Sequence, residues 1–134
     1  MNYPEEMVRG LSNKDTIEDD NTVLAAAFQF TEIKGRQELS INWKDDEGAI
    51  DVAMNQKKKN SEDFQFKVGV AILSKRKIDD IKFLSYERAP IPENHYHGNL
   101  FYNDLSQGKK RLLSGMLSMA VVGVIRREDC FKEK

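Results

Sequence analysis

Alternating apolar and polar positions predict several β-strands along the chain. The clearest lies at 38–43, where Leu39, Ile41 and Trp43 share one face and polar residues stand between them. Side chains alternate between the two faces of a strand, so this pattern is typical of a half-buried strand. Similar alternation, or a short apolar run between polar flanks, predicts further strands at 23–32, 64–74, 83–88 and 98–102.

Helical periodicity predicts three helices. The segment 45–60 begins with acidic and ends with basic residues, which complements the helix dipole, and Ile50, Ala53 and Met54 form a narrow apolar stripe. A short helix is expected near 75–81. From Gln107 onward a long helix is expected, with an apolar face made by Leu113, Met116, Leu117, Ala120, Val121 and Val124.

Strands followed by a final helix indicate an α+β fold. We expect a mainly antiparallel sheet of about five strands, with a short middle helix and a long C-terminal helix packed on it. Residues 1–22 hold six acidic and two basic residues and few apolar ones, which predicts a loose or short-helical polar arm. An acidic docking segment is the alternative for this arm, and residues 23–134 are expected to form one domain.

Composition narrows the class of protein. The 134 residues carry a net charge of −1, so no overall field favours nucleic acid, and the basic clusters are interpreted as solvated helix ends. The single cysteine, Cys130, excludes a disulfide framework and favours a reducing compartment. The apolar run at 112–125 is too short to cross a bilayer. The chain therefore reads as cytoplasmic and not membrane-bound.

The stretch 89–103 holds both histidines and two of the three prolines, and it is the best candidate for a site. Pro90 and Pro92 restrict their own backbone and that of the residues before them, which predicts a stiff extended connector. Such a connector would bring Asn94, His95 and His97 to one place. On an extended backbone the two histidines would point to the same face.

Four interpretations of this stretch are considered. His95 and His97 have the spacing of a metal pair, but no third ligand follows at a suitable distance, so we expect no metal or other cofactor. A structural turn is a second interpretation. A third is contact with a ligand or a protein. A fourth is acid–base chemistry, with His97 and Glu93 as the catalytic candidates. The candidate binding residues are Arg88, Asn94, His95 and His97.

The pattern Pro90-x-Pro92-x-Asn94-x-x-His97 is similar to an element that recurs in a group of small bacterial proteins without an established activity. The resemblance covers residues 37–125 and departs from the group's pattern at Ala89, where Asp is usual, and at His95, where Pro is usual. It implies an accessory role in mobile or defence gene cassettes.

Our leading prediction is therefore a non-enzymatic accessory or protein-binding protein of a bacterial cell, and the protein is expected not to be an enzyme. The alternative is a small enzyme or ligand-binding protein that uses His97 with Asn94, Glu93 or Arg88. Self-association is a further alternative, because Gly115 and Gly123 would make a small-residue surface on the C-terminal helix.

Overall fold

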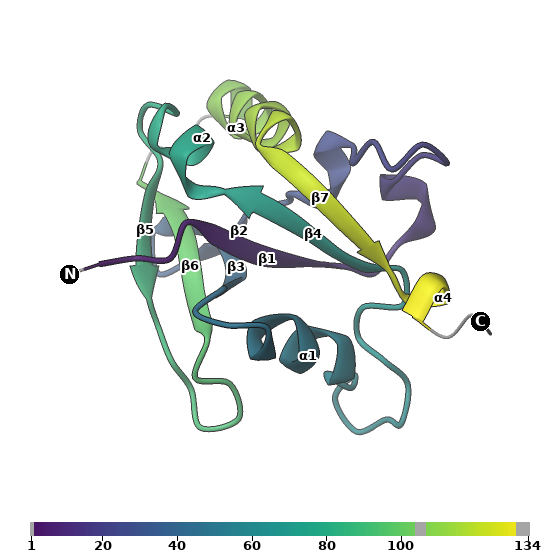
Figure 1. Ribbon diagram of the computed structural model, residues 1–134. Coiled ribbons are helices and arrows are strands. Elements are labelled where there is room, and N and C mark those ends of the chain that lie inside the picture. Colours follow the sequence, from purple (N-terminus) through teal and green to yellow (C-terminus); the bar gives the residue numbers. More distant parts are fainter. Residues whose placement is uncertain (1, 104–106, 131–134) are drawn as a thin grey trace.

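The computed structural model describes residues 2–103 and 107–130, and its centre is one antiparallel sheet (Figure 1). The strand order is β5-β6-β3-β1-β4-β7, and β2 pairs with β3 beside this path. The strands are β1 (Glu6–Leu11), β2 (Thr31–Ile33), β3 (Arg36–Trp43), β4 (Gly69–Ser74), β5 (Ser85–Arg88), β6 (His97–Tyr102) and β7 (Val121–Arg126). The helices are α1 (Gly48–Asn55), α2 (Lys75–Asp79), α3 (Gln107–Met119) and α4 (Arg127–Cys130), with short 3-10 turns η1 (Lys14–Thr16) and η2 (Ala25–Ala27).

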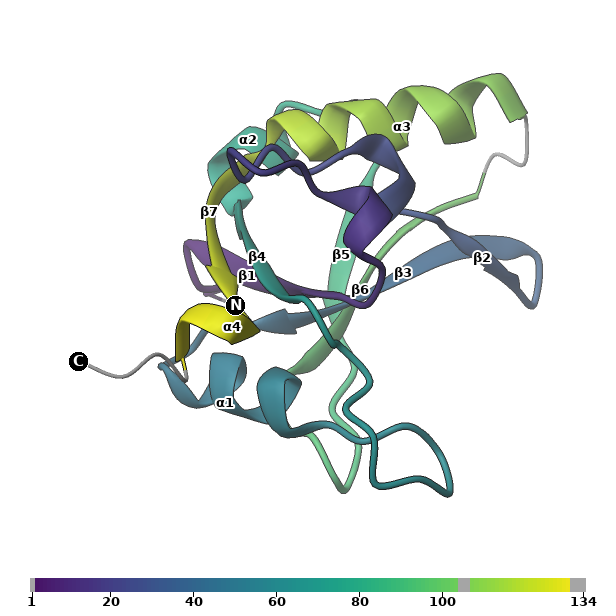
Figure 2. The ribbon, with the colours of Figure 1, turned by 90° about the vertical axis from the view of Figure 1, so that its right-hand side faces the viewer.

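Helices cover the sheet on both faces (Figure 2). On one face Leu113 and Leu117 of α3 join the larger core, which contains Phe28 after η2 and Trp43 of β3. On the other face α1 packs against Val8 and its neighbours. The contacts to α1 come from Val70 and Ile72 of β4, and from Tyr96. The α+β class and the antiparallel sheet are confirmed, with seven strands in place of the expected five.

The loose or short-helical arm predicted for residues 1–22 is wrong for Glu6–Leu11. This segment is strand β1, which lies between β3 and β4. Met7, Val8 and Leu11 are almost completely buried, with Met7 on one face of the sheet and Val8 on the other. This strand is apolar on both faces, as central strands are, and the acidic residues around it made the segment look like a polar arm in the sequence.

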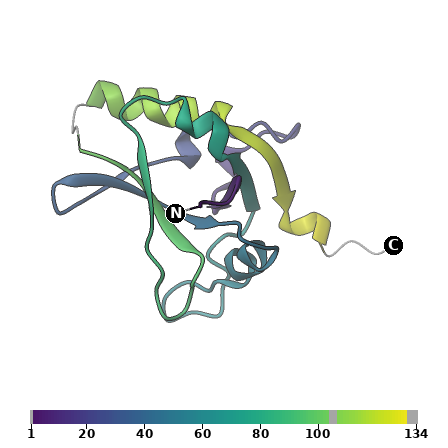
Figure 3. The same ribbon diagram turned by 60° about the vertical axis from the view of Figure 1, so that its left-hand side comes forward.

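The strand predicted at 23–32 is only partly confirmed. Ala25–Ala27 form η2, and only Thr31–Ile33 form a strand. This strand pairs with β3 through a two-residue loop, Lys34 and Gly35, both with positive φ (50° and 85°). Positive φ at both positions gives the turn that matches the twist of a hairpin, although the loop lacks the usual Asn-Gly pair. The β2–β3 hairpin, in blue, projects beyond the sheet in Figure 3.

The long C-terminal helix is shorter than predicted. Helix α3 ends at Met119, and the chain continues as strand β7 beside β4. Val121 and Val124 therefore belong to a strand, whereas Leu113 and Leu117 are buried by the helix as expected. The segment 121–125 is rich in β-branched residues, which favour strands.

The other elements lie close to their predicted positions. The helix expected at 45–60 ends at Asn55, so Lys57–Lys59 lie beyond its C-terminus. The predicted strand 64–74 narrows to β4, and Gly69 at its start has φ 144°; a Cβ added there would overlap the Ile125 carbonyl oxygen. This close approach leaves no room for a side chain. The predictions for the short middle helix, for β5 and for β6 are confirmed.

Candidate functional site

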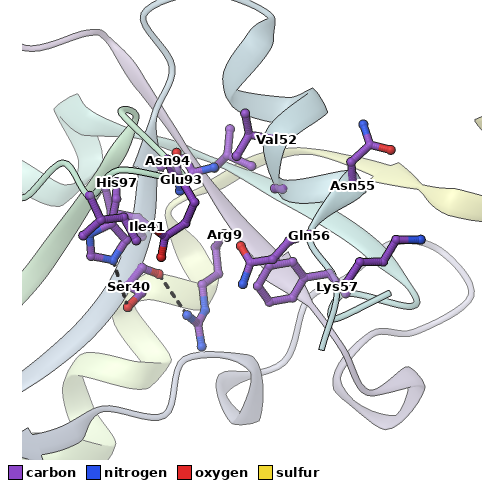
Figure 4. A pocket seen from close by; sticks show the side chains of 16 residues that line it. Arg9, Ser40, Ile41, Val52, Asn55, Gln56, Lys57, Glu93, Asn94 and His97 are labelled. Carbon is purple, nitrogen blue, oxygen red and sulfur yellow. Dashed lines mark hydrogen bonds between the residues drawn. The ribbon is translucent and has the colours of Figure 1, made fainter. Parts of the chain in front are cut away.

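A cavity of about 630 Å³ opens where β1 and β3 separate, beside the C-terminal end of α1. This volume is in the range of small-molecule sites. Figure 4 shows the side chains that line it. They come from β1, β3, α1, the segment after α1, and the proline-containing connection between β5 and β6. Those used below are Arg9, Ser40, Val52, Lys57, Phe66, Ile91, Glu93, Asn94 and His97.

Arg9 occupies the fork between the two strands. β1 pairs with β3 only at Met7 and Val8, so the middle of β3 has no strand neighbour on this side. The Arg9 side chain fills part of that gap: its Nη1 donates to the Ser40 carbonyl at 2.9 Å, and its Nε donates to the Ala27 carbonyl at 3.3 Å. A side chain thus satisfies a carbonyl that a neighbouring strand would otherwise satisfy.

The guanidinium of Arg9 has no direct ion pair with a described residue, although Glu93 lines the same cavity. No carboxylate of the described residues lies within 4.0 Å of its guanidinium. Burial lowers the pKa of Arg9 to about 10, so the group remains charged at neutral pH. Nη2 makes no hydrogen bond within the described part of the chain. The guanidinium therefore keeps hydrogen-bond donors for a group that enters the cavity.

His97 and Ser40 meet on the polar face of the sheet. His97 lies opposite Asn42, and Ser40 lies opposite Asn99, so His97 and Ser40 are diagonal neighbours on β6 and β3. The two side chains approach to 3.4 Å between His97 Nε2 and Ser40 Oγ (Figure 4). The other ring nitrogen, Nδ1, lies 2.8 Å from the Ala89 carbonyl. The histidine is thus held from the protein side and exposes Nε2 toward the cavity.

Asn94 connects three parts of the site and is buried. Its Nδ2 donates to Asn42 Oδ1 at 2.8 Å, and its Oδ1 accepts from the Tyr96 backbone N–H at 3.0 Å. Asn42 in turn donates to the Ala49 carbonyl in α1. This chain of hydrogen bonds ties the proline-containing connection to β3 and α1.

Only some of the site residues predicted from the sequence line the cavity. Glu93 lines it together with Asn94 and His97, whereas His95 and Arg88 do not. The Arg88 guanidinium donates two hydrogen bonds to Asp45, at 3.0 and 2.7 Å, and these hold the pKa of Asp45 below its usual value. Asn94, Glu93 and His97 are the candidates that the structure brings together.

The expectation that both histidines point the same way from an extended backbone is wrong. His95 lies in a turn before β6, and its ring stacks on Tyr96 with 4.0 Å between ring centroids. His97 begins β6 and faces Ser40. In the described ranges, 2–103 and 107–130, no three His, Cys, Asp or Glu side chains form a group able to hold a metal.

Sequence reasoning missed Arg9 and Ser40. Arg9 lies in the segment that the sequence predicts to be an acidic arm, although a single charge inside the run Met7 to Leu11 is unusual for a buried strand. The pattern predicts Ser40 on the polar face of its strand, but no local feature connects it with His97. Cys130, on α4, is exposed and does not line the cavity.

Among the helices of the described residues, none combines the length and apolar character that crossing a bilayer requires. No family model, no curated protein and no solved structure matches this chain.

Proposed function

We propose that the protein binds a small ligand with an anionic oxygen group, a carboxylate or a phosphate, in the cavity between β1, β3 and α1. Arg9 is the observation that carries this proposal. Its guanidinium lines the cavity, is charged at neutral pH and has no carboxylate partner among the described residues. A partly buried cation without a counter-charge is unfavourable, and an anionic ligand would supply that charge.

The hydrogen bonds of Arg9 favour this group of ligands. The two protein carbonyls engage Nε and Nη1, which leaves the Nη2 side of the guanidinium for a ligand. Two N–H groups arranged as a fork match the two oxygens of a carboxylate or phosphate. Lys57 also lines the cavity, with its Nζ 3.9 Å from the centroid of the Phe64 ring. Phe66, Val52 and Ile91 offer apolar contacts for the rest of the ligand.

Replacing Arg9 with glutamine is expected to weaken anion binding by about tenfold or more, because loss of a charged partner in a partly buried pair costs a few kcal/mol. Acetate and inorganic phosphate serve as probes, and backbone NMR shifts of residues around the cavity report binding. Arg76→Gln is the matched control, since Arg76 is exposed on α2 and outside the cavity. Its affinity should equal that of the unmodified protein.

A third variant separates charge from geometry. Arg9→Lys keeps the charge but loses the planar fork, so it should bind more weakly than Arg9 and more tightly than Arg9→Gln. The proposal fails if acetate and phosphate shift no cavity resonance, or if Arg9→Gln lowers stability while leaving the affinity for both anions unchanged. The second result would assign Arg9 a purely structural role in the gap between β1 and β3.

The accessory, protein-binding role is a second proposal, and a separate surface favours it. Leu112, Met116 and Met119 form a stripe on the outer side of α3 and are 59%, 38% and 79% exposed. Val122 of β7 is 49% exposed. β7 is also an edge strand of the sheet, and an uncharged edge is a template for pairing with another chain. A second copy is the occupant we propose, because an antiparallel edge pairs with itself about a twofold axis.

Met119→Glu is expected to shift the protein from dimer to monomer, since it would place a charge in the apolar stripe of each copy. Light scattering during size-exclusion chromatography measures the mass. Ile33→Glu is the control, because Ile33 is also exposed and apolar but lies on β2. A monomer at every concentration of the unmodified protein would contradict self-association.

A further inference from the structure

The ring of His97 has its hydrogen on Nδ1 when it is neutral. Nδ1 lies 2.8 Å from the Ala89 carbonyl, and a carbonyl oxygen only accepts hydrogen bonds. Nε2 then carries the lone pair. The nearest side-chain partner of Nε2 is the Ser40 hydroxyl at 3.4 Å, so Ser40 is the donor and His97 the acceptor.

This arrangement has the parts of an activated serine. A base must lie within reach of the hydroxyl, and a third group must orient the base. His97 is the base, and the Ala89 carbonyl is the orienting group. Pro90 follows Ala89 directly and stiffens the connection that carries this carbonyl. Ser40 itself is exposed toward the cavity, so a substrate can reach its Oγ.

A positive charge stands next to the serine. Arg9 Nη1 donates to the backbone carbonyl of Ser40, so the guanidinium lies beside the backbone of the serine, and both residues line the same cavity. Oxygen gains negative charge when a hydroxyl attacks an ester, and donors already in place stabilise that charge. The same donors would afterwards hold the carboxylate product.

We propose that Ser40 is a nucleophile for acyl transfer from small carboxylic esters to water, with His97 as the general base and Arg9 as the group that stabilises the oxyanion. This step rests on the proposed ligand cavity and identifies its anion as a carboxylate.

The reaction proceeds in two balanced halves. Ser40 Oγ forms a bond to the ester carbon while its proton moves to His97 Nε2. The bond from carbon to the alcohol oxygen then breaks, and the alcohol leaves with that proton. Water attacks the acyl-serine, and Nε2 takes a proton from the water. The bond from carbon to Ser40 Oγ breaks as Nε2 returns its proton to Oγ, and the product leaves as the carboxylic acid, which releases its remaining proton to water and becomes the carboxylate.

The test uses a fluorophosphonate, which reacts with activated serines by forming an O–P bond and losing fluoride. Intact mass is expected to show one adduct per chain, and peptide mapping should place it at Ser40. Ser40→Ala should abolish the adduct. His97→Gln should slow labelling by about a hundredfold, the contribution of a positioned base. Ser85→Ala is the control: Ser85 is exposed on the neighbouring strand β5 and outside the cavity, and labelling should be unchanged.

Two further measurements distinguish a specific loss of labelling from a loss of folding. Circular dichroism and thermal melting confirm that each variant is folded, and added imidazole should restore part of the labelling in His97→Ala, which a merely structural histidine would not allow. The proposal is overturned if the folded protein labels no faster than the urea-unfolded chain, or if the adduct lies on another serine. Acetate binding and labelling of the unmodified protein separate the two proposals. If the unmodified protein binds acetate but takes no adduct at Ser40, the ligand cavity stands and acyl transfer falls; if neither is observed, both fall.

Discussion

Replacing Gly98 with alanine should destabilise the protein by about 2–4 kcal/mol, which combines the cost of overpacking with that of a lost hydrogen bond. Gly98 lies on β6 under the indole of Trp43. A Cβ at this position would overlap Trp43 Nε1 and come within 2.5 Å of the Glu87 carbonyl. These two atoms form a hydrogen bond of 3.1 Å with each other. Urea unfolding followed by circular dichroism measures the change.

The atoms around Gly98 cannot move aside to make room for an added Cβ. Trp43 is completely buried, and the Glu87 carbonyl belongs to the backbone of β5. Gly115→Ala is the matched control, because no atom of the described residues, apart from its chain neighbours and the nearby backbone of α3, lies within 4 Å of a Cβ at that position. It should stabilise the protein by up to about 1 kcal/mol, since alanine favours a helix. Equal stabilities of Gly98→Ala and the unmodified protein would rule out the close packing of Trp43 over β6.

Asn94→Ala is expected to lower the free energy of unfolding by about 2 kcal/mol, because it removes both partners that the Asn94 side chain supplies. Asn42 Oδ1 would lose its donor in a buried position, and the Tyr96 backbone N–H would lose its acceptor. The proline-containing connection would then be attached to β3 and α1 less firmly. Thermal and urea unfolding report the stability, and NMR shifts of Ser40 and His97 report the geometry of the cavity.

Glu93→Ala is the control for this loop, since Glu93 is the exposed neighbour of Asn94 and lines the same cavity. It should change stability by less than about 0.5 kcal/mol, as surface substitutions do. A loss of stability in Glu93→Ala equal to that in Asn94→Ala would show that the loop is sensitive to any change. In that case the buried amide would have no special role.

The local sequence pattern predicts those elements whose residues fit only one kind of secondary structure. β3 reads from its sequence as a strand with one apolar face, and β6 and α2 also lie where their residues indicate. Backbone restriction by proline is a local property, so the sequence alone predicts the candidate site in the proline-containing connection. Three of its residues, Glu93, Asn94 and His97, do line the cavity.

Other elements depended on what lies beside them. The residues of β7 fit a helical face as well as a strand, and their pairing with β4 decides between the two. β1 was hidden among acidic residues because its apolar side chains divide between both faces, so no single face appears in the pattern. For both segments, the neighbouring strand supplies the hydrogen bonds that make the extended conformation stable.

The sequence by itself determined the fold class and a stiff turn that carries one useful histidine. Only the tertiary structure decided what that histidine faces. Ser40 lies 57 residues away from His97 in the chain, and the register of β3 with β6 brings them together. Arg9 enters the same site because β1 separates from β3 after Val8. Register and strand separation arise from packing over the whole sheet, and no local pattern contains them.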